Sequence, residues 1–155
     1  METSSDFQQT IGLLGGEATI RARIGNVVEA HDALLKGLPA DALLHLVSSV
    51  SLLEHGETLQ NAVGISLRTL QRHKARPKGA GSQRLSVEQS NRAWRFAELF
   101  AHAVAVMGSR AAAEDWMNQP AIGLCNRKPI ELLGTSAGME AVAEYLTRLE
   151  YGVYT

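Results

Sequence analysis

The sequence is poor in cysteine, in aromatic residues and in long apolar runs. Its single cysteine, Cys125, excludes an internal disulfide and a thiolate metal cluster, and it suits the reducing cytoplasm. Aromatic residues make up only 5% of the 155 residues, so a core must be built mainly from Leu, Ala, Val and Ile. No apolar run approaches the roughly 20 residues of a membrane span, and the N-terminus does not resemble a signal peptide. We therefore expect a cytoplasmic globular protein without a membrane partner.

The chain also has little net charge, but its charges are unevenly distributed. The formal net charge is -1. Residues 66–95 nevertheless hold eight basic residues and one acidic residue, whereas residues 1–65 hold three basic and eight acidic, and residues 96–155 hold four basic and seven acidic. Local positive charge attracts phosphate backbones, and the effect depends on the patch more than on the total. The distribution indicates a nucleic-acid contact in the middle of the chain, with a solvated basic helix face as the simplest alternative.

Apolar residues recur at helical spacings along the chain, and no stretch shows the alternation of a strand. Glycine, proline and capping residues divide this pattern into successive helices. Ser86 and Gln89, for example, have the spacing of a capping box at the start of the longest helix. The sequence predicts an all-α fold with helices over residues 17–35, 40–53, 57–63, 67–76, from the capping box to about 107, 110–118, and from 135 or 136 to about 150.

Residues 57–76 have the pattern of a helix-turn-helix. This motif needs a first helix, a tight turn that commonly holds glycine, and a second helix that enters the major groove of DNA. Gly64 suits the turn, and Ser66 suits the N-cap of the second helix. In this register the residues predicted to be buried between the helices are Leu59, Val63, Ile65 and Leu70.

The second helix of this motif is predicted to present a basic, exposed face to DNA. Arg68, Arg72 and Arg76 recur every four residues and therefore share roughly one face. Arg and Gln pair with guanine and adenine edges, whereas lysines and Arg84 suit phosphates. The predicted DNA-binding residues are Ser66, Arg68, Thr69, Gln71, Arg72, His73, Lys74, Arg76 and Lys78. Because a single unit binds weakly, specific recognition favours a homodimer on a two-fold site, with helices of residues 17–53 between the two copies.

Two features keep other interpretations of this segment open. Gln60 and His73 occupy positions where such motifs often carry alanine and an apolar residue. The same pattern would suit an ordinary helical hairpin with a basic side, or a surface that binds an acidic protein.

The sequence gives no support for catalysis or metal binding. Residues 134–138, "GTSAG", match the G-x-S-x-G of serine hydrolases, but that motif follows a strand and requires a later histidine, and the last histidine here is His102. Ser136 is more simply an N-cap. The five histidines show no ligand-like pairing, and there is one cysteine. We expect a protein that is not an enzyme and that holds no metal and no cofactor.

The C-terminal third carries a spaced series of tryptophan, proline, glycine and apolar residues. Its members are Ala112, Trp116, Pro120, Leu124, Pro129, Leu132, Leu133, Gly138, Val142, Leu146 and Glu150 to Tyr154. This series resembles the toxin-binding domain shared by the Xre, ParS and MbcA antitoxins. Residues 64–103 are similar to the helix-turn-helix half of the same family, so the resemblance covers roughly the last 100 residues.

The resemblance implies an N-terminal helix-turn-helix DNA-binding bundle, residues 1–108, followed by a small helical toxin-binding domain, residues 109–155. Such antitoxins bind and neutralise a RES-domain toxin, an ADP-ribosyltransferase-like enzyme that destroys NAD, and repress their shared operon. In this family the extreme C-terminus reaches into the NAD site of the toxin. The toxin-binding residues that this implies are Arg148, Glu150, Tyr151, Gly152, Val153, Tyr154 and Thr155. Operator DNA and a larger hetero-oligomer with the toxin are the implied assemblies.

Without the resemblance, residues 151–155 by themselves indicate only a surface that could bind another protein. Tyrosines that follow a helix end can form an adhesive surface, because tyrosine offers much contact area at low entropic cost; a frayed terminus is the plainer alternative. For the whole chain, the alternative is a stand-alone helix-turn-helix transcriptional regulator with a C-terminal dimerisation or sensing domain.

Overall fold

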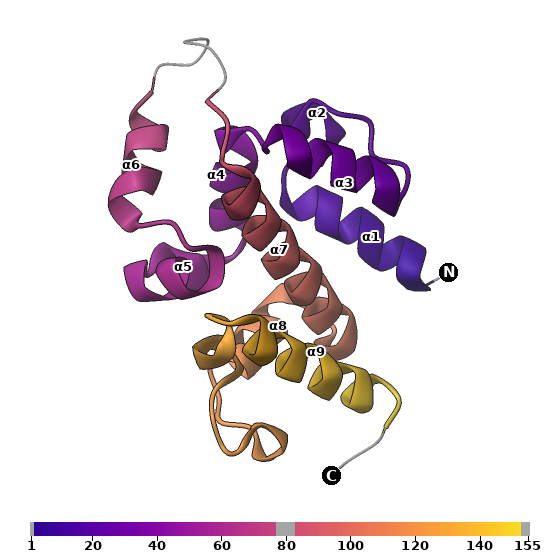
Figure 1. Ribbon diagram of the computed structural model, residues 1–155. Helices are drawn as coiled ribbons and strands as arrows, with labels where there is room; N and C mark the ends of the chain where they lie inside the picture. The colour runs from indigo at the N-terminus through magenta and orange to yellow at the C-terminus, as the bar shows by residue number, and fades with distance from the viewer. Residues whose placement is uncertain (1, 77–82, 153–155) are drawn as a thin grey trace.

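A computed structural model of the chain describes residues 2–76 and 83–152, with the side chains of residues 2–5 left aside. Every regular element in these ranges is helical, which confirms the all-α prediction (Figure 1). Two antiparallel bridges, Pro39 with Arg84 and Ala121 with Arg127, are isolated pairs. The elements are α1 (Glu2–Leu13), α2 (Gly16–Ile20), α3 (Val27–Lys36), α4 (Ala40–Ser49), η1 (Ser51–Glu54), α5 (Gly56–Val63), α6 (Leu67–Ala75), α7 (Val87–Met107), α8 (Arg110–Met117), η2 (Ile122–Leu124), η3 (Pro129–Leu132) and α9 (Ser136–Glu150).

The 21-residue helix α7 runs through the middle of the molecule and contacts both halves of it (Figure 1). Helices α1, α3 and α5 pack along it, and α8 and α9 pack near its C-terminal end. Its buried residues combine small side chains with Leu99 and three aromatic ones, Trp94, Phe96 and Phe100. The rings of Phe96 and Phe100 lie nearly parallel with centroids 6.0 Å apart. Three of the eight aromatic residues thus lie on the one helix that fills the space between many others.

Helix α1 was not predicted from the sequence, although it packs closely on α7. Ile11 and Leu14 are buried, and the ring of Phe7 meets Trp94 edge-on at a centroid distance of 5.9 Å. Gly15 and Gly16 separate α1 from α2, with φ values of 95° and 81° that favour glycine. Residues 7–14 therefore contribute to the core of the N-terminal half.

The single helix predicted over residues 17–35 is wrong, because two helices occupy this range. Arg21 adopts φ 62° after α2, and the side chain of Asn26 starts α3 by accepting a hydrogen bond from the backbone N–H of Glu29 at 2.9 Å. Val27 and Val28, which continue the helical apolar spacing of the sequence, are 73% and 70% exposed. The helix predicted over residues 40–53 likewise ends at Ser49, and a 3-10 turn follows it.

Most of the predicted helix boundaries after residue 56 are confirmed by their capping contacts. Ser86 and Gln89 form the reciprocal capping box of α7, and Gly108 ends this helix at φ 97°. Ser109 caps α8 by accepting from the N–H of Ala112. Thr135, rather than Ser136, caps α9, since its hydroxyl accepts from the N–H of Gly138 at 3.0 Å. The "GTSAG" segment follows a 3-10 turn and opens a helix, so it lacks the preceding strand of a hydrolase nucleophile.

Candidate functional site

The helix-turn-helix forms as predicted. Gly64 ends α5 at φ 76°, and the hydroxyl of Ser66 caps α6 by accepting from the N–H of Thr69 at 3.1 Å. The four side chains predicted to hold the two helices together have exposed fractions of only 0 to 1%: Leu59, Val63, Ile65 and Leu70. Helix α6 packs on α4 and α5. This packing leaves the opposite face of α6 open to solvent.

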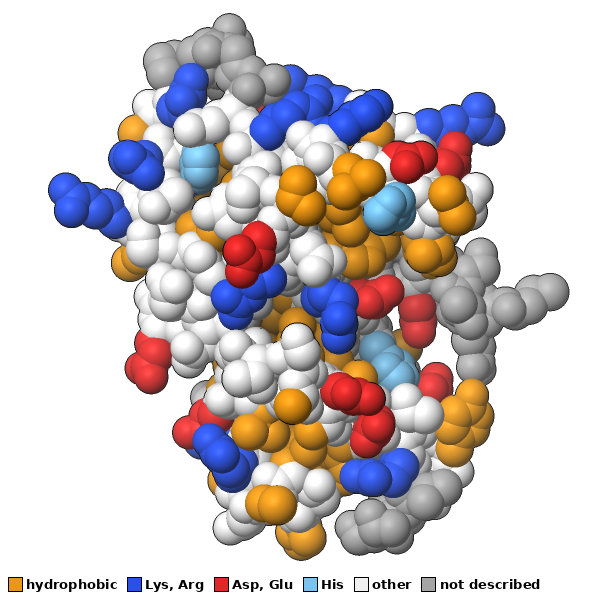
Figure 2. Space-filling view, viewed as in Figure 1, with side chains coloured by type: hydrophobic (Ala, Val, Ile, Leu, Met, Phe, Trp, Pro, Cys, Tyr) orange, Lys and Arg blue, Asp and Glu red, His pale blue; other side chains and the backbone are white. Residues whose placement is uncertain are grey.

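The basic residues of α6 lie on that open face. Arg68, Gln71, Arg72, Lys74 and Arg76 are exposed, and Figure 2 shows Lys and Arg side chains projecting from this side of the molecule. The ion pairs found within residues 2–76 and 83–152 join Arg21 to Asp41 and His102 to Glu150, so neither uses a cation of α6. The positive charge of the helix is therefore available to an external anion. Lys78 lies outside the described residues.

His73 is less exposed than the sequence predicted. Its side chain is half-buried, and its Nδ1 is buried without a hydrogen-bond partner among the described residues. Burial lowers the pKa of His73, Gln83 acts in the opposite direction, and the positive charges of Arg72 and Arg76 lower the pKa further. Thr69 is also half-buried, and its hydroxyl accepts a hydrogen bond from the hydroxyl of Ser66 at 3.0 Å. The freely exposed part of the predicted face is thus narrower than the sequence suggested.

Two further arginines join segments that are far apart in sequence, and one of them, Arg92, fastens the helix-turn-helix to α7. Arg92 of α7 donates a hydrogen bond to the backbone carbonyl of Asn61, and its guanidinium occupies the space where a side chain on Gly64 would lie. Arg84 donates to the carbonyl of Gly37 at 2.7 Å. The sequence assigned Arg84 to phosphates and gave no role to Arg92, because neither backbone partner is close in sequence. Only the fold brings these groups together.

The predicted toxin-binding residues begin at an aromatic stack on the C-terminal domain. The rings of Trp116 and Tyr145 stack with centroids 6.1 Å apart, and the guanidinium carbon of Arg148 lies 5.7 Å from the centre of the Tyr145 ring. The Nε of Arg148 is buried without a hydrogen-bond partner among the described residues. A cation held against an aromatic face is restricted in direction. Arg148 is therefore preoriented, unlike the arginines of α6.

The last described residues lie at the end of α9. Oε1 of Glu150 lies 3.2 Å from Nε2 of His102, which connects this end of α9 to α7. Tyr151 is 70% exposed, and Gly152 follows it at φ 70°. Val153, Tyr154 and Thr155 lie outside the described residues. The structure thus brings together Arg148, Glu150, Tyr151 and Gly152 at one edge of the molecule.

The described part of the chain has neither a cluster of metal-ligating side chains nor a membrane-spanning helix. It contains no group of three or more His, Cys, Asp or Glu side chains arranged to hold a metal ion. Within residues 2–76 and 83–152, no helix combines the length and the apolar character needed to cross a bilayer.

Comparison with known proteins places both halves of the chain in one family. The family model described as the antitoxin Xre-like helix-turn-helix domain matches residues 29–98. The model described as the antitoxin Xre/MbcA/ParS C-terminal toxin-binding domain matches residues 102–152. The two matches meet within α7, which the structure shows to be the helix common to both halves.

Curated relatives agree with the family models. A protein named antitoxin Xre from Yersinia enterocolitica is 32% identical over 127 residues, which cover 80% of each chain. The antitoxin Xre of Photorhabdus laumondii is 29% identical over 121 residues, or 77% of each chain, and that of Pseudomonas putida is 33% identical over 88 residues, covering 57% of this chain and 52% of the relative. The predicted resemblance is confirmed, and the chain belongs to the family of Xre-type antitoxins.

Proposed function

We propose that this chain is the antitoxin of a type II toxin-antitoxin module that neutralises an NAD-degrading RES-type toxin and represses its own operon. The observation that carries the proposal is the match of a toxin-binding domain directly after a helix-turn-helix, in a chain whose α6 cations are exposed. In this proposal residues 1–108 serve DNA binding and residues 109–155 serve toxin binding, and the protein works in the cytoplasm.

The DNA contact is assigned to the open face of α6. Arg68 and Arg72 suit guanine edges, Gln71 suits adenine, and Lys74 and Arg76 suit phosphates. Ser66, Thr69, His73 and Lys78 complete the proposed set. Recognition of a two-fold operator would use two copies, and the exposed apolar residues Val28 and Leu35 of α3, which lie outside the groove described below, support a homodimer contact there. A monomer in light scattering at micromolar concentration would remove the dimer from this proposal.

The toxin contact is assigned to the end of α9 and the tail, through Arg148 and residues 150–155. Neutralisation works by occlusion: a tail that fills the NAD site excludes the substrate, so affinity alone suffices and no chemistry by the antitoxin is required. We therefore propose that the protein is not an enzyme. Tyr151, exposed next to the preoriented Arg148, supports an anchoring contact of the kind that dominates protein interfaces.

Co-expression with the product of the neighbouring gene tests the proposal. A stable complex, and toxicity that returns when residues 151–155 are removed, are the expected results. The truncated chain should keep its helical circular dichroism and its operator binding, since the deleted residues follow the last helix. If no complex forms while operator binding persists, the chain is instead a stand-alone regulator. Unchanged neutralisation by the truncated chain would refute the tail mechanism alone.

A further inference from the structure

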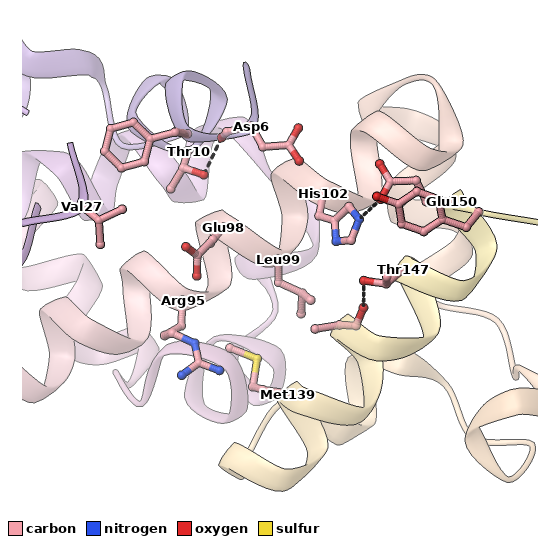
Figure 3. Close-up of a pocket in the computed structure, with 13 residues that line it drawn as sticks. Asp6, Thr10, Val27, Arg95, Glu98, Leu99, His102, Met139, Thr147 and Glu150 are labelled. Carbon is pink, nitrogen blue, oxygen red and sulfur yellow. Dashed lines mark hydrogen bonds and ion pairs between the residues drawn. The ribbon is translucent and has the colours of Figure 1, made fainter. Parts of the chain in front are cut away.

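A groove of about 450 Å³ lies between α1, α7 and α9, at the junction of the two halves (Figure 3). Its apolar floor includes Leu99 and Met139, each 7% exposed, and the half-buried ring of Phe7. Carboxylates from all three helices border it: Asp6, Glu98 and Glu150. Figure 2 shows acidic side chains and a histidine gathered in the band between the N-terminal helices and the C-terminal domain.

The charges of this groove are poorly balanced. Within the described residues neither Asp6 nor Glu98 forms an ion pair, and the only Lys or Arg that lines the groove is Arg95. Burial raises the pKa of Asp6. His102 lowers this pKa, and the negative charge of Glu150 raises it. Burial also raises the pKa of Glu98, although Arg95 opposes it. The two carboxylates are therefore less well stabilised than in water, and a bound cation would offset this cost.

We propose that the groove is a second contact for the toxin and that it takes a cationic amphipathic segment of that protein. Apolar side chains of the segment would pack on Phe7, Leu99 and Met139, while its Lys or Arg residues would meet the three carboxylates. Charge complementarity and a concave apolar floor are the features that such a segment requires. The inference rests on the proposed antitoxin function.

Continuity with the proposed tail contact supports this occupant. Glu150 and Tyr151 line the groove and also belong to the proposed toxin-binding residues. A toxin whose NAD site receives the tail would therefore lie directly beside the groove. Asp6, Phe7 and Thr10 come from α1, outside residues 102–152 of the matched toxin-binding domain. The inference thus extends the toxin surface to the N-terminal helix of the chain.

The test compares the toxin affinity of the wild-type chain, the double variant Asp6→Asn/Glu98→Gln and the control Glu54→Gln. Glu54 is exposed on η1 and lines no part of the groove. We expect the double variant to bind the toxin about 5- to 30-fold more weakly at low salt, with a flatter salt dependence. The control should bind as the wild type does, and circular dichroism melts should show that both variants are folded.

A second measurement uses the unaltered complex. Zero-length carbodiimide cross-linking, which joins carboxylates to amines in contact, should connect Asp6 or Glu98 to a lysine of the toxin. Equal affinity of the double variant at every salt concentration, together with no such cross-link, would overturn this inference but leave the proposed function intact. Cross-links from the groove to a second copy of this chain would also overturn it. Failure of the wild-type chain to bind the toxin would overturn both proposals.

Discussion

The open face of α6 and the end of α9 differ in how their charged side chains are held. On α6 the exposed arginines form no ion pair within the described residues, so their long side chains can adapt to an anion. At the end of α9, Arg148 lies on Tyr145 and Glu150 contacts His102. DNA presents regularly spaced phosphates, which flexible cations can follow, whereas a protein cleft requires a fixed shape. The contrast suits the two proposed partners.

The largest effect is expected from removing two arginines of α6. Arg68→Ala/Arg72→Ala should weaken operator binding by about 2–6 kcal/mol, since each good contact to a base contributes about 1–3 kcal/mol. Toxin binding should not change. Gel shifts over a protein titration measure the first quantity, and Arg110→Ala, an exposed cation of α8, is the matched control. Because the control removes one charge and the double variant removes two, a loss in the control about half as large as in the double variant would mean that only total charge matters.

A substitution in the C-terminal domain should weaken toxin binding and leave operator binding unchanged. A side chain on Gly138 would collide with the backbone carbonyl of Leu132, so Gly138→Ala should destabilise this domain by about 2–3 kcal/mol. A Cβ on Gly134 would only reach ordinary van der Waals contact with Oδ1 of Asn61, at 4.0 Å, so Gly134→Ala should be nearly neutral. Urea unfolding gives the stability, and pull-down with the toxin gives the binding. Loss of operator binding in Gly138→Ala would show that the two halves do not behave independently.

Removing a helix cap from each half of the molecule should destabilise the two halves by similar amounts. Ser66→Ala removes the cap of α6 and Thr135→Ala removes the cap of α9, and each should cost about 1 kcal/mol. Amide hydrogen exchange should locate the first loss in α6 and the second in α9. If both variants accelerate exchange over the whole chain to the same extent, the protein unfolds as a single cooperative unit.

The smallest expected effect is the response to acid. The pKa of His73 is lowered, so the unfolded chain binds its proton first and stability falls as the pH drops below 6.5 toward the folded pKa. The pKa values of Asp6 and Glu98 are raised above their ordinary values of 3.8 and 4.5, so the folded chain binds these two protons before the unfolded chain does as the pH falls. The stability of the fold therefore falls as the pH rises from these ordinary values to the raised pKa values of the folded chain. The free energy of unfolding, measured in urea at a series of pH values, gives both dependences. The fall in stability below pH 6.5 should disappear in His73→Gln, and the fall with rising pH should disappear in Asp6→Asn/Glu98→Gln.

Local signals account for what the sequence predicted correctly. Gly64, Ser66 and the pair Ser86 and Gln89 act through atoms within four residues, and such contacts are readable along the chain. The break after Arg21 was missed because the apolar spacing continues across it, while the decisive cap depends on Asn26. Periodicity alone does not show where a helix stops.

Long-range contacts account for what the sequence could not supply. Helix α1 becomes part of the core because Phe7 meets Trp94, and the groove beside it needs Asp6, Glu98 and Glu150 from three separate helices. The same holds for the contact of Arg92 with Asn61 and the stack of Arg148 on Tyr145. Each of these depends on packing geometry, which no local pattern encodes.

The uninterrupted course of α7 has a consequence for larger assemblies. A helix of 21 residues is roughly 30 Å long and carries no hinge between the residues that fasten the helix-turn-helix and those that support α8 and α9. Two chains bound to operator half-sites about 34 Å apart would therefore hold their toxins at a separation and an angle dictated by the DNA. The spacing of the operator would then decide whether neighbouring toxins can touch.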